Sequence, residues 1–201
     1  MIDGVIKYHV SHTQGQAPHF EEYAELEALR ARLFALGLIG ETPDGIGFGN
    51  LSLRVNGKSC FITATQTGKQ AQLSQDEYTF IEGYDFDAFT LFFKGKFPPS
   101  SEALSHAMIY EVHSDIQAVI HIHSAPLWHM MLKEKYLSTS AEYGTAEMVQ
   151  EISSLYAKYN PFEHHAFVMK GHENGIVTFG RSIEEAELKL YQIIRAHLQA
   201  D

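Results

Sequence analysis

The sequence has only one cysteine, Cys60, so a disulfide bond within the chain is impossible and the fold cannot depend on one. It also lacks any apolar run close to the roughly 20 residues that a membrane-spanning helix needs. The first residues show no charged segment followed by an apolar one, which is the pattern of a signal peptide. We therefore expect a cytoplasmic protein with no membrane as partner.

Positive charge is also scarce. Lysine and arginine number 15 against 25 aspartate and glutamate residues, which gives a net charge of −10 with histidine counted as neutral. No block rich in lysine and arginine offsets this balance, so nucleic acid is not an expected partner. An acidic protein can still bind an anionic small molecule locally, through backbone amides, hydroxyls and a metal ion. The length of 201 residues suits a single domain, which we expect to span residues 1–201.

Helical and strand patterns alternate along the chain. The turn at Asn56-Gly57, between two runs of alternating residues, is a strong hairpin signal and argues against a purely parallel sheet. The segment 8–20 is polar and is predicted to be irregular. The residues therefore favour an α/β fold with a mixed or antiparallel sheet flanked by helices. Helices are predicted at 20–38, 101–113, 125–132, 145–159 and 182–198, and strands at 46–55, 60–63, 91–93, 118–123, 166–169 and 175–180.

Histidine is abundant, with 12 residues in the chain. His121 and His123 stand two apart in the apolar run 118–123, and side chains at that spacing on a strand point to the same face. Imidazole is a good zinc ligand, and catalytic zinc sites combine three protein ligands with one open position. Two histidines on a polar strand face are the alternative. His172, between Gly171 and the predicted strand at 175–180, is by itself an ordinary loop histidine.

Three polar segments have the composition of an anion site. Ser100-Ser101-Glu102 precedes a helix, whose free amides and positive end attract anions, although an ordinary helix cap would look the same. The glycines in 47–52 would let the backbone approach a ligand beside Asn50, or would allow a strand bulge. The segment 63–68 is a hydroxyl-rich turn after a strand, which suits an anion or a simple loop.

Taken as a set, these segments resemble the class II aldolase/adducin family, also called the fuculose-phosphate aldolase family. The resemblance extends from about Leu26 to Leu190. It implies one α/β domain with a central, mostly antiparallel sheet, and a homotetramer of fourfold symmetry with the active site near a subunit interface. The matching segments are 49–52, Thr67-Gly68, Ser100-Ser101-Glu102 with His106 and Tyr110, 118–123, and His172 before Gly175.

The resemblance also assigns roles to residues. His121, His123 and His172 match the ligands of a divalent metal, which we expect to be zinc, and Glu102 matches the catalytic acid–base. A metal held by neutral histidines can stabilise an enediolate while a glutamate moves the proton. The implied function is a metal-dependent lyase acting on a phosphorylated sugar or ketose. The positions that match the phosphate-binding residues are Asn50, Thr67, Gly68, Ser100 and Ser101.

The chain differs from the family pattern in several places. The turn 63–68 is longer than the family's Thr-Pro-Ser/Thr-Gly turn and lacks its proline. The third histidine lies in Gly-His-Glu-Asn-Gly, where many relatives have Asn-His-Gly, so His164 and His165 are alternative ligands. Two tyrosines, Tyr136 and Tyr143, are available for the tyrosine roles of the sugar-phosphate aldolases, but neither aligns with them.

Several functions share such a site. Methylthioribulose-phosphate dehydratases and pentulose-phosphate 4-epimerases use similar metal-assisted chemistry on a phosphoketose. An adducin-like interaction module would keep the fold without catalysis, although it would have no need for three aligned ligands. A plain metal-binding protein would have no need for the anion-binding segments.

Overall fold

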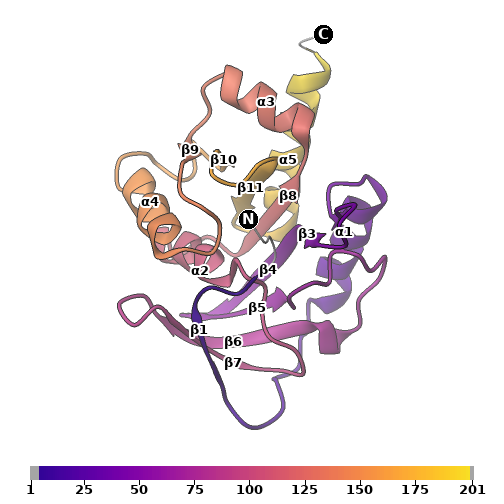
Figure 1. The fold of residues 1–201 in the computed structure, drawn as a ribbon, viewed down its shortest axis with the longest axis vertical. Helices are drawn as coiled ribbons and strands as arrows, with labels where there is room; N and C mark the ends of the chain where they lie inside the picture. Colours follow the sequence, from indigo (N-terminus) through magenta and orange to yellow (C-terminus); the bar gives the residue numbers. More distant parts are fainter. Residues whose placement is uncertain (1–4, 200–201) are drawn as a thin grey trace.

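The computed structural model describes residues 5–199 as an α/β fold built around one large sheet (Figure 1). The strands of this sheet are β1 (His9–His12), β4 (Asn50–Asn56), β5 (Ser59–Thr63), β6 (Tyr78–Asp85), β7 (Thr90–Lys94), β8 (Ala118–His123), β9 (Ser138–Thr139), β10 (Ala166–Met169) and β11 (Gly175–Gly180). They lie in the order β1-β7-β6-β5-β4-β8-β11-β10-β9. Only the two edge pairs, β1 with β7 and β9 with β10, are parallel. The predicted α/β fold with a mostly antiparallel sheet is therefore confirmed.

Helices cover both faces of the sheet. They are α1 (Tyr23–Ala35), α2 (Ala103–Val112), α3 (Ala125–Lys133), α4 (Ala146–Tyr156) and α5 (Ile183–Leu198). Buried residues of α2 and α4 form one apolar core with one face, and those of α1, α3 and α5 form a second core with the other (Figure 1). A separate two-stranded sheet, β2 (Gly40–Glu41) and β3 (Gly47–Phe48), precedes β4, and a short 3₁₀ turn spans Gln75–Glu77. No helix of the described residues is long and apolar enough to cross a membrane.

The two cores show which way each side chain of β8 points. Val119 belongs to the core under α2 and α4, whereas Ile120 and Ile122 belong to the core under α1, α3 and α5. Because successive strand side chains alternate between faces, His121 and His123 lie on the same face as Val119. The face of the sheet under α2 and α4 therefore carries the paired histidines.

Local signals in the sequence agree with several element boundaries. The turn at Asn56-Gly57 joins β4 to β5 as predicted, with Gly57 in the left-handed region at φ 47°. That conformation is nearly free of strain for glycine only. Ser182 caps α5, since its side chain accepts a hydrogen bond from the Glu185 amide.

Two predictions about elements were wrong. The segment 8–20, expected to be irregular, contains β1, whose four residues are all exposed at the edge of the sheet and so show no apolar alternation. The helix expected from residue 101 begins at Ala103, and Glu102 is its N-cap residue, not part of its first turn. Its carbonyl accepts a hydrogen bond from the His106 amide, which is the bond expected of a residue at that position. Strand β6 was not anticipated.

Candidate functional site

Three histidines meet at one end of β8. His121 and His123 come from the strand itself, and His172 comes from the turn before β11, whose Gly175 pairs with His123. The His123 Nε2 atom lies 3.2 Å from His121 Nε2 and 3.0 Å from His172 Nε2. Ligand atoms of all three residues lie within 4.8 Å of one another, close enough to bind one metal ion together.

The chemistry of these nitrogens fits a divalent cation. His121 Nδ1 lies 3.1 Å from the Ile176 carbonyl oxygen, to which only a protonated Nδ1 can donate, so Nε2 can act as a ligand. Burial, followed by repulsion from the neighbouring histidines, lowers the pKa of His123 to about 2, which keeps its ring neutral. Nitrogens bound at about 2.0–2.1 Å in a tetrahedron would lie roughly 3.3 Å apart, close to the two spacings given above. The three side chains therefore suit a metal that prefers imidazole.

Glu102 lies beside this cluster and is 5% exposed. Its Oε2 atom accepts a hydrogen bond of 2.8 Å from Asn50 Nδ2 and lies 3.0 Å from His121 Nε2. Burial alone would raise the pKa of Glu102, but positive charge at His121 and His172 and the Asn50 bond hold that pKa well below its ordinary value. A carboxylate oxygen and an imidazole nitrogen at this distance need a proton or a cation between them. Glu102 is thus an ionised carboxylate that faces the histidine cluster.

A pocket adjoins the histidines and Glu102. The empty space in and in front of it is about 390 Å³, which includes space open to solvent. Two loops are joined there, because the Ser100 amide donates to the Thr63 carbonyl and the Thr65 amide donates to the Pro98 carbonyl. The residues that line it include Asn50, Thr67, Gly68, Ser100 and Ser101, with Glu102, His123, Tyr143 and His172. The structure therefore brings the five expected phosphate-binding residues together around one pocket, next to the histidines.

Backbone amides of this pocket are available to a ligand. The N–H groups of Thr67, Gly68 and Ser101 donate to no acceptor among residues 5–199. Some of the side chains are already engaged: the Thr67 hydroxyl donates to the Ala64 carbonyl at 2.8 Å, and the Ser100 hydroxyl accepts from the Glu102 amide at 3.3 Å. Backbone N–H groups without acceptors are a common way to bind an anion in a protein with few positive charges.

Asn50, which was predicted only as a phosphate-binding residue, also contacts Glu102. It faces His121 across the β4–β8 pair and orients the Glu102 carboxylate through its amide nitrogen. Its Oδ1 atom is buried and has no hydrogen-bond partner within the described chain. A buried oxygen in that state is suited to accept a hydrogen bond from a bound ligand.

The unusual turn 63–68 is held by a side-chain hydrogen bond and by close packing of its glycine. Gln66 takes a left-handed conformation at φ 58°, and its side-chain oxygen accepts a hydrogen bond of 3.0 Å from the Gly47 amide. Gly68 is confined by backbone, because a Cβ atom there would lie 2.5 Å from the Gly40 carbonyl oxygen. The glycine keeps this turn close to β3 without the proline that the family pattern would supply.

Tyr143 is the pocket residue that sequence reasoning did not place. Its ring centroid lies 4.8 Å from that of His172, and the Lys7 ammonium group lies 3.8 Å from the centre of the Tyr143 ring. It belongs to the irregular segment before α4, where no periodic pattern exists to show its direction. His164 and His165 lie outside the histidine cluster and line a different pocket, as does Tyr136.

A buried polar chain lies behind the site on the same face of the sheet. The Ser52 hydroxyl lies 2.7 Å from His106 Nδ1 and 2.6 Å from the Tyr110 hydroxyl. Burial is the main reason that the pKa of His106 falls to about 3, so this histidine is neutral in the folded protein. The contact between His106 and Ser52 ties α2, whose N-cap residue is Glu102, to β4.

The fold and the three-histidine site define an α/β protein with a candidate metal centre beside a candidate anion-binding pocket. Residues 42–198 match the family model described as the class II aldolase and adducin N-terminal domain. The chain therefore belongs to the class II aldolase and adducin family.

Several solved structures share this fold. An L-fuculose 1-phosphate aldolase is 17% identical, with a TM-score of 0.67 over 91% of this chain and 85% of the other. A sugar-phosphate aldolase from Thermotoga maritima is also 17% identical, with a TM-score of 0.65 over 86% and 90%. YgbL from Escherichia coli is 19% identical, with a TM-score of 0.66 over 88% and 86%. No curated protein sequence gave a significant match.

Proposed function

We propose that this protein is a metal-dependent, aldolase-like lyase that acts on a phosphorylated sugar or ketose. One observation carries the proposal: the three-histidine cluster, the ionised Glu102 and a pocket lined by backbone amides that have no acceptor among residues 5–199 are next to one another. Each feature alone has an ordinary structural explanation. Their convergence supports a site that binds an anionic substrate beside a metal.

The residues around the pocket would have separate roles in substrate binding, proton transfer and positioning. Amides of Thr67, Gly68 and Ser101, together with the Ser100 hydroxyl, would hold the substrate phosphate and fix the rest of the substrate beside the histidines. A divalent ion bound there would act as a Lewis acid on a substrate oxygen. Glu102 would accept a proton from the substrate and return it, because it is the ionised carboxylate beside the cluster. Asn50 would keep that carboxylate in place.

Zinc is the ion that we propose for His121, His123 and His172, since zinc readily takes three imidazole nitrogens with one position left open. The assembly that we propose is a homotetramer of fourfold symmetry, which follows from the family resemblance. Sedimentation at micromolar concentration tests the assembly, and a stable monomer would contradict it.

The test of the function is a substrate screen on protein of known metal content. A panel of phosphorylated ketoses is incubated with the metal-loaded protein and with the chelator-treated protein, and the same sugars without phosphate serve as the control. Release of an aldehyde supports the lyase, an epimer would identify an epimerase, and loss of water would identify a dehydratase. If no phosphorylated compound reacts and no metal is bound, the non-catalytic, adducin-like interpretation replaces this proposal.

A further inference from the structure

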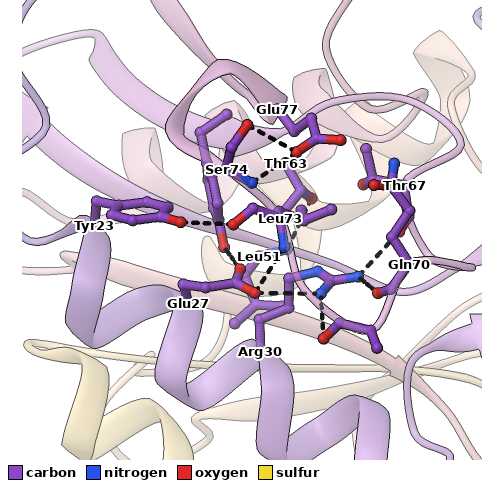
Figure 2. Close-up of polar contacts among 12 residues, drawn as sticks. Tyr23, Glu27, Arg30, Leu51, Thr63, Thr67, Gln70, Leu73, Ser74 and Glu77 are labelled. Atoms are coloured by element: carbon purple, nitrogen blue, oxygen red, sulfur yellow. Dashed lines mark hydrogen bonds and ion pairs between the residues drawn. The ribbon is translucent and has the colours of Figure 1, made fainter.

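Arg30 of α1 is a buried cation next to the anion pocket. The residue is 1% exposed, and its guanidinium group donates to three backbone carbonyls of a single loop. One of the bonds, from Nη2 to the Thr67 carbonyl oxygen, is 2.9 Å long, and a second goes to Gln70 (Figure 2). The third goes to Ala71. Guanidinium has the fixed, forked geometry that can hold several carbonyls at once.

The Thr67 carbonyl is directed at Arg30 and also accepts a hydrogen bond of 3.1 Å from the Gln70 amide, and its direction fixes that of the next amide. A peptide bond is planar and trans, so the Thr67 carbonyl and the Gly68 N–H point in opposite directions. With the carbonyl directed at Arg30, the Gly68 N–H is directed away from α1. Gly68 lines the anion pocket, and its N–H has no acceptor in the part of the chain that the structure describes.

Glu27 fixes the guanidinium from the other side. Its Oε1 atom lies 3.6 Å from Arg30 Nη1 and accepts a hydrogen bond from the Leu73 amide (Figure 2). Its Oε2 atom accepts a hydrogen bond from the Tyr78 hydroxyl. Helix α1, the loop after β5 and the start of β6 are thus tied to one charged group. The positive charge stays close to the turn, and its position has little freedom.

We propose that Arg30 is a positioning residue for anion binding: it holds the Thr67 carbonyl so that the Gly68 N–H faces the substrate phosphate. This inference rests on the proposed function, which places the phosphate at the Thr67-Gly68 turn. Polarisation of the peptide group by the guanidinium would also strengthen the Gly68 N–H as a donor, as hydrogen bonds in a chain reinforce one another.

A purely structural role for Arg30 makes a different prediction. A buried ion pair adds little net stability compared with a well-packed apolar group, so folding alone gives a weak reason for a buried arginine. If Arg30 only stabilised the fold, a folded variant would bind phosphate as the wild type does. If it positions the turn, phosphate binding falls even in a folded variant.

The test measures the dissociation constant of inorganic phosphate by calorimetry on the metal-loaded protein. Arg30→Lys keeps the charge but loses the fork, and Arg30→Gln loses the charge as well. Arg32→Lys is the matched control, because Arg32 lies on the same helix but is exposed and bonds to Glu187 at the surface. We expect Arg30→Lys to weaken phosphate binding by roughly tenfold and Arg32→Lys to change it by less than about twofold, with metal content unchanged in both.

Two further readouts separate the possible outcomes. On a true substrate, Arg30→Lys should raise KM by a similar factor and leave kcat within a few fold. In ¹⁵N-labelled wild type, the Gly68 amide resonance should shift on addition of phosphate, and this measurement needs no variant to fold. Equal phosphate binding by wild type and Arg30→Lys, or a Gly68 resonance that does not move while phosphate binds, would overturn the inference alone. A wild type that binds no phosphate would overturn the proposed phosphate site and this inference with it.

Discussion

Replacement of Glu102 by glutamine tests the catalytic role most directly. The change keeps the size of a side chain that is almost completely buried and removes only its charge and its basicity. The Asn50 amide nitrogen, now 2.8 Å from Oε2, can still donate to the oxygen of the new amide. The same Oε2 atom lies 3.0 Å from His121 Nε2, so an amide oxygen in that place keeps both neighbours and the N–H₂ group takes the place of Oε1. The variant should therefore fold and keep the pocket.

The size of the effect follows from the role. A positioned general acid–base contributes about 10²–10⁴ in rate, which corresponds to roughly 2.7–5.4 kcal/mol in the activation barrier. In the proposed site, the amides of the turn 63–68 and of Ser101 bind the phosphate, and three histidines bind the metal. Neither includes Glu102, so the loss should fall on kcat and leave KM within a few fold.

The assay is steady-state kinetics on a substrate found in the screen, combined with elemental analysis of the same Glu102→Gln preparation. Glu111→Gln, on the exposed side of the same helix, is the control for removal of one negative charge. If Glu102→Gln loses its metal, Glu102 is a ligand and the assignment of roles changes. If its kcat equals that of the wild type, another residue carries the proton and the proposed mechanism is refuted.

Three other predictions concern the metal, the anion and acid. His121→Ala should lose most of its bound metal by elemental analysis, whereas His164→Ala should keep it, and full occupancy in the first would refute the ligand assignment. Ser101→Asp should raise KM for a phosphorylated substrate at least about tenfold through charge repulsion, and indifference to the change would indicate a substrate without phosphate. His106 has a folded-state pKa of about 3 against about 6.5 when unfolded, so the unfolded chain binds more protons between these values. The free energy of unfolding should fall as pH drops below about 6.5, by up to about 1.4 kcal/mol per pH unit from this residue. Urea titrations at several pH values should show a smaller dependence of this free energy on pH in His106→Gln than in the wild type. An unchanged dependence on pH would contradict a neutral, buried His106.

The parts of the site that could be predicted are those with a periodic signal. The spacing of His121 and His123 on an apolar strand was enough to put both rings on one face, because the side chains of a strand repeat every two residues. The hairpin at Asn56-Gly57 and the cap at Ser182 follow from local chemistry in the same way. Each of these depends on neighbours along the chain.

The features that the sequence did not predict depend on contacts between segments that are far apart along the chain. Tyr143 reaches the pocket from an irregular segment, and β1 pairs with β7 through backbone atoms alone. Arg30 did leave a signal, since it stands four residues after Leu26 and three before Leu33, on the buried face of α1. A charged residue at such a position must find partners, but the pattern cannot show that these partners are the carbonyls of a loop about 40 residues away.

The position of the site in the fold explains why its polar groups tolerate burial. On β8, Val119 packs into the core under α2 and α4, and His121 and His123 continue along the same face beyond it. Asn50 and Ser52 of β4 lie on that face too and bond to groups of α2 or its cap. At this end of the sheet, burial that elsewhere stabilises apolar side chains keeps the imidazoles of His106 and His123 neutral and shields the Glu102 carboxylate from water. The core therefore does not merely support the site, because its low polarity acts on the protonation of His123 and Glu102, the groups that we propose as a metal ligand and as the base.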